Sequence, residues 1–280
     1  MGVRIVTDSS SDLPASLATE LGITVVPCNL HFGQETFRDS VDMDADVFYQ
    51  RLSSESQLPT TSQPSPGAFL KVYRGLSEAG HQVVSIHVSN ALSGTVNSAL
   101  QAKEQLPGAT VEVIDSRQVS LSLGLAVTAA ARAATSGASF QETLQVARRA
   151  LEQVRFYALL DTLEYLRRGG RVGKVKGFVG SLLRVRPLIT AREGLVESVT
   201  SVRSRAAGIQ YMVTLAEEAA PIQQLAVMHA TTPDEAEELA KRLSPMIPGK
   251  SVIRARVGPV IGTHAGPGAI GIAIQSDKSQ

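Results

Sequence analysis

Three short segments rich in hydroxyl side chains could together hold an anion. They are residues 7–12, 60–65 and 89–95. Each is predicted to lie just beyond the carboxyl end of a strand, which is the edge where parallel sheets bind their ligands. The third segment also opens a helix, so the Ser93 hydroxyl and free backbone N–H groups meet at the positive end of a helix dipole. Such a site holds a carboxylate or a phosphate without needing a lysine.

A histidine supplies a fourth candidate group. His264 lies in the glycine-rich stretch GPVIGTHAGPGAIG, residues 258–271. Glycines at this density let a backbone adopt positive φ and pass close to another group. Since aliphatic runs flank the stretch, we expect a tight loop between two buried strands that directs His264 inward. An isolated histidine is more often a hydrogen-bonded core residue, but three hydroxyl-rich segments elsewhere favour an oxyanion pocket.

The same residue types also have a purely structural interpretation. Ser, Thr and Asp are the ordinary N-caps of helices, and each segment taken singly is better explained that way. We expect Asp12 and Ser65 to be helix caps and nothing more. The anion site is therefore inferred from the combination of segments.

Motifs that would indicate a known enzyme class are absent or out of context. Residues 266–271 match G-x-G-x-x-G, but they lead into a strand instead of opening a helix, so dinucleotide binding is excluded. There is no Walker P-loop, and Ser93 lacks the G-x-S-x-G nucleophile elbow. A triad of Ser93, His264 and Asp8 stays open, although no spacing supports it. The histidines and the one cysteine lack metal-ligand spacing, so we expect no metal. Because the enzyme motifs above are missing, we also expect no catalytic residues and no cofactor.

Basic residues are concentrated in one part of the chain. Residues 167–205 contain ten Lys or Arg and two Asp or Glu, whereas the whole chain has a formal net charge of +1. This basic strip suggests an anionic partner or substrate, or simply a solvated face. A helix C-terminus with cations and a glycine cap explains Arg167, Arg168 and Gly169. It does not explain Arg171 or Lys174.

Alternating strands and helices must position these residues. We expect strands at 3–7, 23–30, 82–88 and 111–115, then at 156–161, 187–190, 195–202, 224–229, 252–257 and 270–274, with a helix near 175–183. This pattern predicts an α/β protein of two α/β domains. Residues 1–154 would form a parallel sheet flanked by helices, and 155–280 a mixed sheet with helices mainly on one side. The ligand is expected in the cleft between them.

Composition narrows the ligand and the compartment. The chain is 43% hydrophobic but 4% aromatic with no Trp, so its interior must be aliphatic and would suit an aliphatic ligand. A single cysteine, Cys28, indicates a reducing compartment. The first residues lead into a strand without a signal-peptide pattern, and no segment is long and apolar enough to span a bilayer. We predict a cytoplasmic protein without stable membrane insertion.

Five segments in this order resemble those of the DegV family. They are IVTDSSSDLP, TTSQPSPG, SNALSGTVNSA, LEYLRRGGRVG and GPVIGTHAGPGAIG, and they span the chain. The resemblance implies a bacterial fatty-acid-binding protein, not itself an enzyme, that holds a long-chain fatty acid between two domains. It also implies an acyl carrier that presents the carboxylate to a fatty-acid kinase protein for acyl-phosphate formation.

The resemblance assigns roles to particular residues as well. The groups implied at the fatty-acid carboxylate are Thr61, Ser93 and the backbone N–H of Gly94, with His264 close by. Ser62, next to Thr61, is included as a further candidate ligand-binding residue. Arg171 and Arg203 are implied to face the kinase and its phosphates. Because they share the basic strip, Arg167 and Lys174 are grouped with them.

Two other classes remain open on sequence. One is a small-molecule enzyme, either an acyl hydrolase using Ser93 and His264 or a substrate subunit like that of dihydroxyacetone kinases, with a small polar pocket. The other is a nucleic-acid-binding protein that uses the basic strip. Few aromatic residues are interleaved with the basic ones, so we expect no nucleic acid partner.

Overall fold

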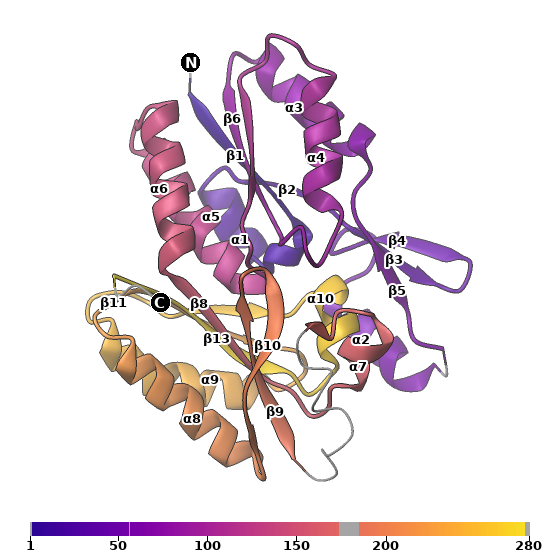
Figure 1. Ribbon diagram of the computed structural model, residues 1–280, viewed down its shortest axis with the longest axis vertical. Coiled ribbons are helices and arrows are strands. Elements are labelled where there is room, and N and C mark those ends of the chain that lie inside the picture. The colour runs from indigo at the N-terminus through magenta and orange to yellow at the C-terminus, as the bar shows by residue number, and fades with distance from the viewer. Residues whose placement is uncertain (1, 56, 174–184, 278–280) are drawn as a thin grey trace.

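The computed structural model describes residues 2–55, 57–173 and 185–277. In these residues three β-sheets are present, and helices pack on both faces of the two larger ones (Figure 1). The α/β fold predicted from the sequence, with a parallel sheet in the first half and a mixed sheet in the second, is confirmed.

The first sheet is parallel, in the order β2-β1-β6-β7. Its strands are β1 (Val3–Asp8), β2 (Thr24–Val26), β6 (Gln82–His87) and β7 (Val111–Asp115). Helices α3 (Pro66–Glu78) and α4 (Thr95–Glu104) cover one face, and α1 (Ala15–Glu20), α5 (Ser120–Thr135) and α6 (Phe140–Gln153) cover the other. Because side chains alternate along a strand, Val6 packs toward α3 and α4 while Ile5 packs toward α5.

The second sheet is mixed, in the order β10-β9-β8-β13-β11-β12. Its strands are β8 (Val154–Leu159), β9 (Arg186–Arg192), β10 (Leu195–Val202), β11 (Ile222–His229), β12 (Ile253–Arg256) and β13 (Ile270–Ser276). Helices α8 (Arg205–Glu218) and α9 (Pro233–Leu243) cover one face with aliphatic side chains. The predicted boundary after residue 154 adjoins the start of β8 and stays a prediction.

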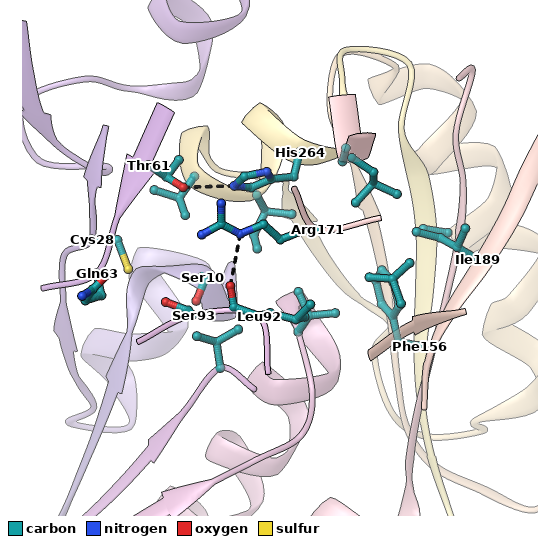
Figure 2. Close-up of a pocket in the computed structure, with 18 of the residues that line it drawn as sticks. Ser10, Cys28, Thr61, Gln63, Leu92, Ser93, Phe156, Arg171, Ile189 and His264 are labelled. Carbon is teal, nitrogen blue, oxygen red and sulfur yellow. Dashed lines mark hydrogen bonds between the residues drawn. The ribbon is translucent and has the colours of Figure 1, made fainter. Parts of the chain in front are cut away.

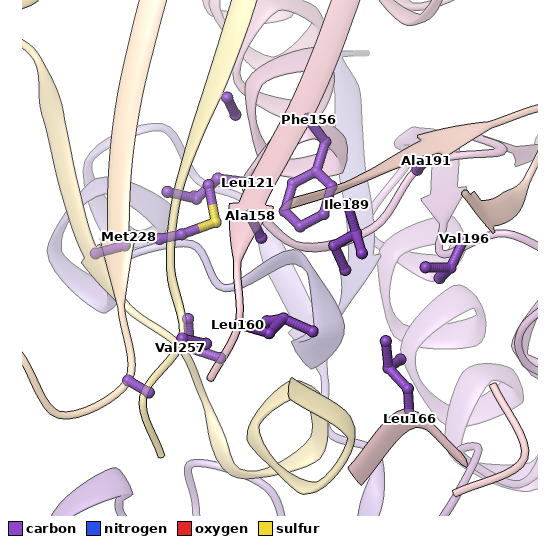
Figure 3. Close-up of a cluster of buried hydrophobic side chains, with 14 of the residues drawn as sticks. Leu121, Phe156, Ala158, Leu160, Leu166, Ile189, Ala191, Val196, Met228 and Val257 are labelled. Carbon is purple, nitrogen blue, oxygen red and sulfur yellow. The ribbon is translucent and has the colours of Figure 1, made fainter. Parts of the chain in front are cut away.

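Helix α5 lies between the two larger sheets. Of its sixteen residues eleven are buried, so little of the helix faces solvent. Leu123 and Val127 join the core of the parallel sheet, whereas Leu121 packs with Phe156 and Met228 of the mixed sheet (Figure 3). The two sheets therefore share one helix, which contributes side chains to the cores of both.

The third sheet is small, antiparallel and absent from the sequence prediction. It consists of β3 (Asn29–Phe32), β4 (Glu35–Arg38) and β5 (Thr60–Ser62), with α2 (Ala45–Ser54) packed nearby. The single strand expected at 23–30 is wrong, because Pro27 has no N–H for the ladder and the chain leaves the parallel sheet after β2. Residues 60–62 also lie within a strand of this sheet, and not beyond the end of a parallel one.

The glycine-rich stretch is not the loop that we expected. It contains helix α10 (Pro259–Ala265), with proline at the first turn, where its missing N–H costs nothing. A Cβ on Gly262 would lie 2.5 Å from the Tyr49 hydroxyl, so this glycine serves close helix packing. Gly266, at φ +80, ends the helix beside the Tyr165 ring of α7 (Glu164–Arg168). The helix predicted at 175–183 lies outside the described residues.

Of the two expected helix caps, one is correct and one is wrong. Ser65 caps α3 by accepting a hydrogen bond from the amide of Ala68. The N-cap of α1 is Pro14, and the buried Asp12 side chain instead accepts hydrogen bonds from Ser120 and from the amide of Gly258. No helix in the described ranges is long and apolar enough to cross a membrane.

Candidate ligand-binding site

A mostly apolar cavity lies where the carboxyl edge of the parallel sheet meets the mixed sheet, beside β5 and α10. About 800 Å³ of space, counted out to the opening and including the solvent there, is free of protein atoms. Figure 2 shows Thr61, His264, Arg171 and Ser93 gathered at one end, and Phe156 at the other. The apolar wall is formed by Val88, Leu92, Val119, Phe156, Ala158, Leu160, Leu166, Ile189, Val196, Val260, Ile261 and Ala265.

Two of the predicted residues meet across the polar end. Thr61 comes from β5 and His264 from the last turn of α10, and Nε2 of the imidazole lies 3.0 Å from the Thr61 Oγ1. Burial, followed by the positive charge of Arg171, lowers the pKa of His264 to about 4. The imidazole is therefore neutral at physiological pH.

The surroundings of this imidazole favour one of its two neutral tautomers. Its Nδ1 is buried, has no hydrogen-bond partner, and packs so closely against Gly169 that a Cβ there would lie 2.1 Å away. Nδ1 lacks a partner in either neutral tautomer, but a buried N–H without an acceptor is rarer in proteins than a buried acceptor without a donor, so we expect the proton on Nε2. With the proton on Nε2, His264 donates to the Thr61 Oγ1. The Thr61 hydroxyl is then free to donate into the cavity.

Ser93 stands at the start of α4, as predicted. Its Oγ lies 2.8 Å from the Thr95 Oγ1, and Gly94 is the N-cap residue of the helix. The space for a side chain on Gly94 is taken by Gln63, whose Nε2 would lie 3.0 Å from a Cβ. The hydroxyl and the first amides of α4 thus present hydrogen-bond donors at the positive end of a ten-residue helix.

The predicted ligand-binding residues come together in the fold. Thr61, Ser62, Ser93 and His264 all line the cavity, and Gly94 directly follows Ser93. The Ser62 hydroxyl lies 2.9 Å from Nε2 of His31 on the neighbouring strand β3. Their role in binding a ligand stays a prediction.

Arg171 lines the cavity. The resemblance grouped it with residues that face a partner kinase, and that role stays a prediction. Its Nε donates to the carbonyl of Leu92 at 3.2 Å, and its Nη1 donates to the carbonyl of Gly169 at 2.6 Å. These two bonds hold the guanidinium at the polar end of the cavity (Figure 2).

Of the other predicted basic residues, the two that the structure describes, Arg167 and Arg203, do not line the cavity. Arg167 is exposed and forms an ion pair with Glu164 at 2.7 Å, and Arg168 pairs with the same carboxylate. Arg203 is exposed and directly follows the last residue of β10, Val202. Lys174 lies outside the described residues.

Sequence reasoning missed a buried polar network below the cavity. Asp8 accepts hydrogen bonds from Ser10, from the amide of Val88 and from Nδ1 of His87, whose Nε2 contacts the Ser85 hydroxyl at 2.7 Å. Burial raises the pKa of Asp8, but these hydrogen bonds and the His87 charge outweigh it and lower the pKa. The network supports Ser10, which lines the cavity and belongs to the first hydroxyl-rich segment.

The triad that the sequence left open is not assembled. Asp8 contacts His87 and not His264, while Ser93 contacts Thr95. Asp8, His87 and Ser85 do follow an acid–base–hydroxyl order. All three are 0% exposed, so a substrate could not reach the hydroxyl. Among the described residues no cluster of His, Cys, Asp or Glu could hold a metal ion.

The fold and the cavity define a class: an α/β protein whose two large sheets enclose an apolar cavity with hydrogen-bond donors at one end. Residues 2–277 match the model of a family described as "Uncharacterised protein, DegV family". A DegV domain-containing protein from Streptomyces coelicolor is 36% identical over 279 residues, or 98% of each chain. The chain belongs to the DegV family.

Solved structures of two relatives share the whole fold. A DegV family protein from Thermus thermophilus, described for its fatty acid binding, has a TM-score of 0.91 at 32% identity, covering 99% of this chain and 100% of that one. DegV of Bacillus subtilis, a fatty acid binding protein, has a TM-score of 0.90 at 31% identity, with the same coverage.

The buried imidazole gives a direct test of the site's electrostatics. We expect ¹⁵N NMR of histidine-labelled protein to show His264 as the neutral Nε2–H tautomer, losing neutrality only as the pH falls toward about 4. Because an unfolded histidine takes up its proton near pH 6.5, the folded state should lose stability as the pH falls through this interval. His264→Gln should remove that loss. A His264 that titrates near pH 6.5 would contradict the buried geometry.

Proposed function

We propose that this protein binds one long-chain fatty acid in the cavity, with the carboxylate at the polar end. The observation that carries the proposal is the division of the cavity: donors from Thr61, Ser93 and Arg171 at one end, and an aliphatic wall along the rest. The fatty acid binding of the DegV relatives supports the same ligand.

The energetics fit an acyl chain. Burial of apolar groups contributes ~0.8 kcal/mol per CH₂, so a chain of about sixteen carbons gains on the order of 10 kcal/mol from desolvation. A carboxylate moved out of water must keep its hydrogen bonds, each worth about 1.5–3 kcal/mol when one partner is charged. A neutral His264 can relay a donor through Thr61, and Arg171 supplies the compensating positive charge.

The cavity does not support the alternative of a small-ketone enzyme. A triose carries hydroxyl groups along its length and needs polar partners throughout. Here the polar groups lie at one end, and the far wall is formed by residues such as Phe156, Leu160 and Ile189. A long apolar tail fills such a space without leaving polar groups unsatisfied.

The ligand can be identified directly. Protein purified from a bacterial host should release a near-stoichiometric long-chain fatty acid on denaturing extraction, as measured by mass spectrometry. The same preparation should not hydrolyse acyl esters. Lipid-free protein that also fails to take up labelled hexadecanoic acid would contradict the proposal, as would a bound triose.

Head-group contacts are tested by two variants and a neighbouring control. We expect Thr61→Val and Ser93→Ala each to weaken fatty-acid binding by ~1.5–3 kcal/mol, because each removes a hydrogen bond to a charged group. The control Thr60→Val changes the neighbouring, exposed residue and should bind fatty acid normally. All three variants are compared in one calorimetric binding assay. Unchanged affinity in both cavity variants would place the carboxylate elsewhere.

We propose further that the bound acid is presented to a kinase. In this reaction a carboxylate oxygen attacks the γ-phosphorus of the kinase's ATP, the bond to the β–γ bridging oxygen breaks, and acyl phosphate and ADP form. ATP phosphates must then approach a cavity end where Arg171 lies. The exposed Arg203 is our candidate for charge that faces the kinase.

Two arginine variants separate binding from presentation. Arg171→Ala should lower both fatty-acid affinity and the phosphorylation rate, since Arg171 lines the cavity. Arg203→Ala should bind fatty acid normally but slow acyl-phosphate formation with a cognate kinase. That reaction should also weaken as salt rises, because exposed charges are screened over ~8–10 Å. If Arg203→Ala supports phosphorylation at the normal rate, that residue belongs to a solvated face.

A further inference from the structure

We propose that Asp12 is a positioning residue that holds helix α10, and with it His264, in the geometry that binds the ligand. Asp12 lies in the loop after β1, far in sequence from the helix that it would hold. The inference rests on the proposed function, because it names how the binding geometry is maintained.

The Asp12 carboxylate joins three elements. Its Oδ1 accepts a hydrogen bond from the amide of Gly258, the N-cap of α10, at 2.9 Å. Its Oδ2 accepts from the hydroxyl of Ser120, the first residue of α5. The side chain thus ties the start of α10 to the helix that both large sheets share.

The start of α10 leaves little room for adjustment. A Cβ on Gly258 would lie 3.2 Å from Oδ1 of Asp12 and 3.6 Å from Oδ1 of Asp39. The Tyr49 hydroxyl donates to the carbonyl of Val257 at 3.1 Å, just before the helix. The amide of Gly258 therefore has a fixed place, and Asp12 is the group that accepts its proton.

A shift at this end reaches His264 because α10 is short and regular. The amides of Gly262 and Gly266 donate to the carbonyls of Gly258 and Gly262, each at 2.8 Å, so the helix moves as one unit. His264 contacts Thr61 at 3.0 Å across the cavity. A displacement of about 0.5 Å or more lengthens that contact beyond hydrogen-bond distance.

The burial and the shape of the Asp12 side chain suggest a conservative variant. Burial, together with the nearby carboxylates of Asp39 and Asp8, raises the pKa of Asp12 well above its usual value. Asparagine has nearly the shape of aspartate; its oxygen can accept from the amide of Gly258, and its NH₂ group can donate to the Ser120 hydroxyl. Asp12→Asn should preserve the hold on α10, whereas Asp12→Ala should remove it.

The test compares these variants by affinity for labelled hexadecanoic acid and by ¹⁵N NMR of His264. Asp12→Ala should lose about tenfold or more in affinity, and its His264 should titrate nearer the ordinary pH of 6.5. Asp12→Asn should stay within about threefold of the parent, with an unchanged His264 titration. Leu239→Ala, which opens the core beneath α9, serves as a matched loss of stability away from α10 and should change neither readout.

Several outcomes would overturn the inference. They are an unchanged affinity and His264 titration in Asp12→Ala, the same losses in Asp12→Asn, or the same losses in Leu239→Ala. If Asp12→Ala does not fold, Gly258→Ala disturbs the same contact with Asp12 in place and should produce the same two changes. The His264 titration needs no ligand, so failure of fatty-acid binding in the parent protein would count against the proposed function alone.

Discussion

The burial of α5 between the two large sheets constrains the rest of the molecule. Leu121 packs on the mixed sheet and Leu123 on the parallel sheet, so opposite faces of one helix serve two cores. Separating the sheets would expose both faces to water, at roughly 25 cal/mol per Å² of apolar surface. The helix begins at Ser120, and its N-cap Val119 lines the cavity. The cavity therefore lies at the N-terminal end of α5, where the helix no longer fills the space between the two sheets.

Within that space, polar and apolar groups are kept apart. The carboxyl edge of the parallel sheet supplies Ser93 through the start of α4, and α10 supplies His264. The mixed sheet supplies Phe156, Ala158 and other apolar side chains. An unsatisfied polar group is costly in such a cavity, so each donor is held by a neighbour. Arg171, for example, is fixed by the carbonyls of Leu92 and Gly169.

Net charge along the sequence was a poor guide to the location of positive charge in the fold. Arg167 and Arg168 share the carboxylate of Glu164 at the surface, and Arg205 pairs with Glu235. The exposed pairs with Glu164 contribute little to stability, whereas the Arg205 side chain is largely buried. Among the described basic residues of the strip, Arg171 is the one that lines the cavity, and its charge helps to keep His264 neutral.

Local pattern was sufficient for much of this protein. Apolar runs predicted β1, β6 and β7, Ser65 marked the start of α3, and ordered motifs identified the DegV family. Tertiary structure decided what local pattern could not. The glycines around His264 suggested a loop, yet they form a helix packed against Tyr49; Asp12, read as a cap, contacts Gly258 far along the chain. A glycine needed for a turn and one needed for close packing look alike in sequence, because the contacting group is more than 200 residues away.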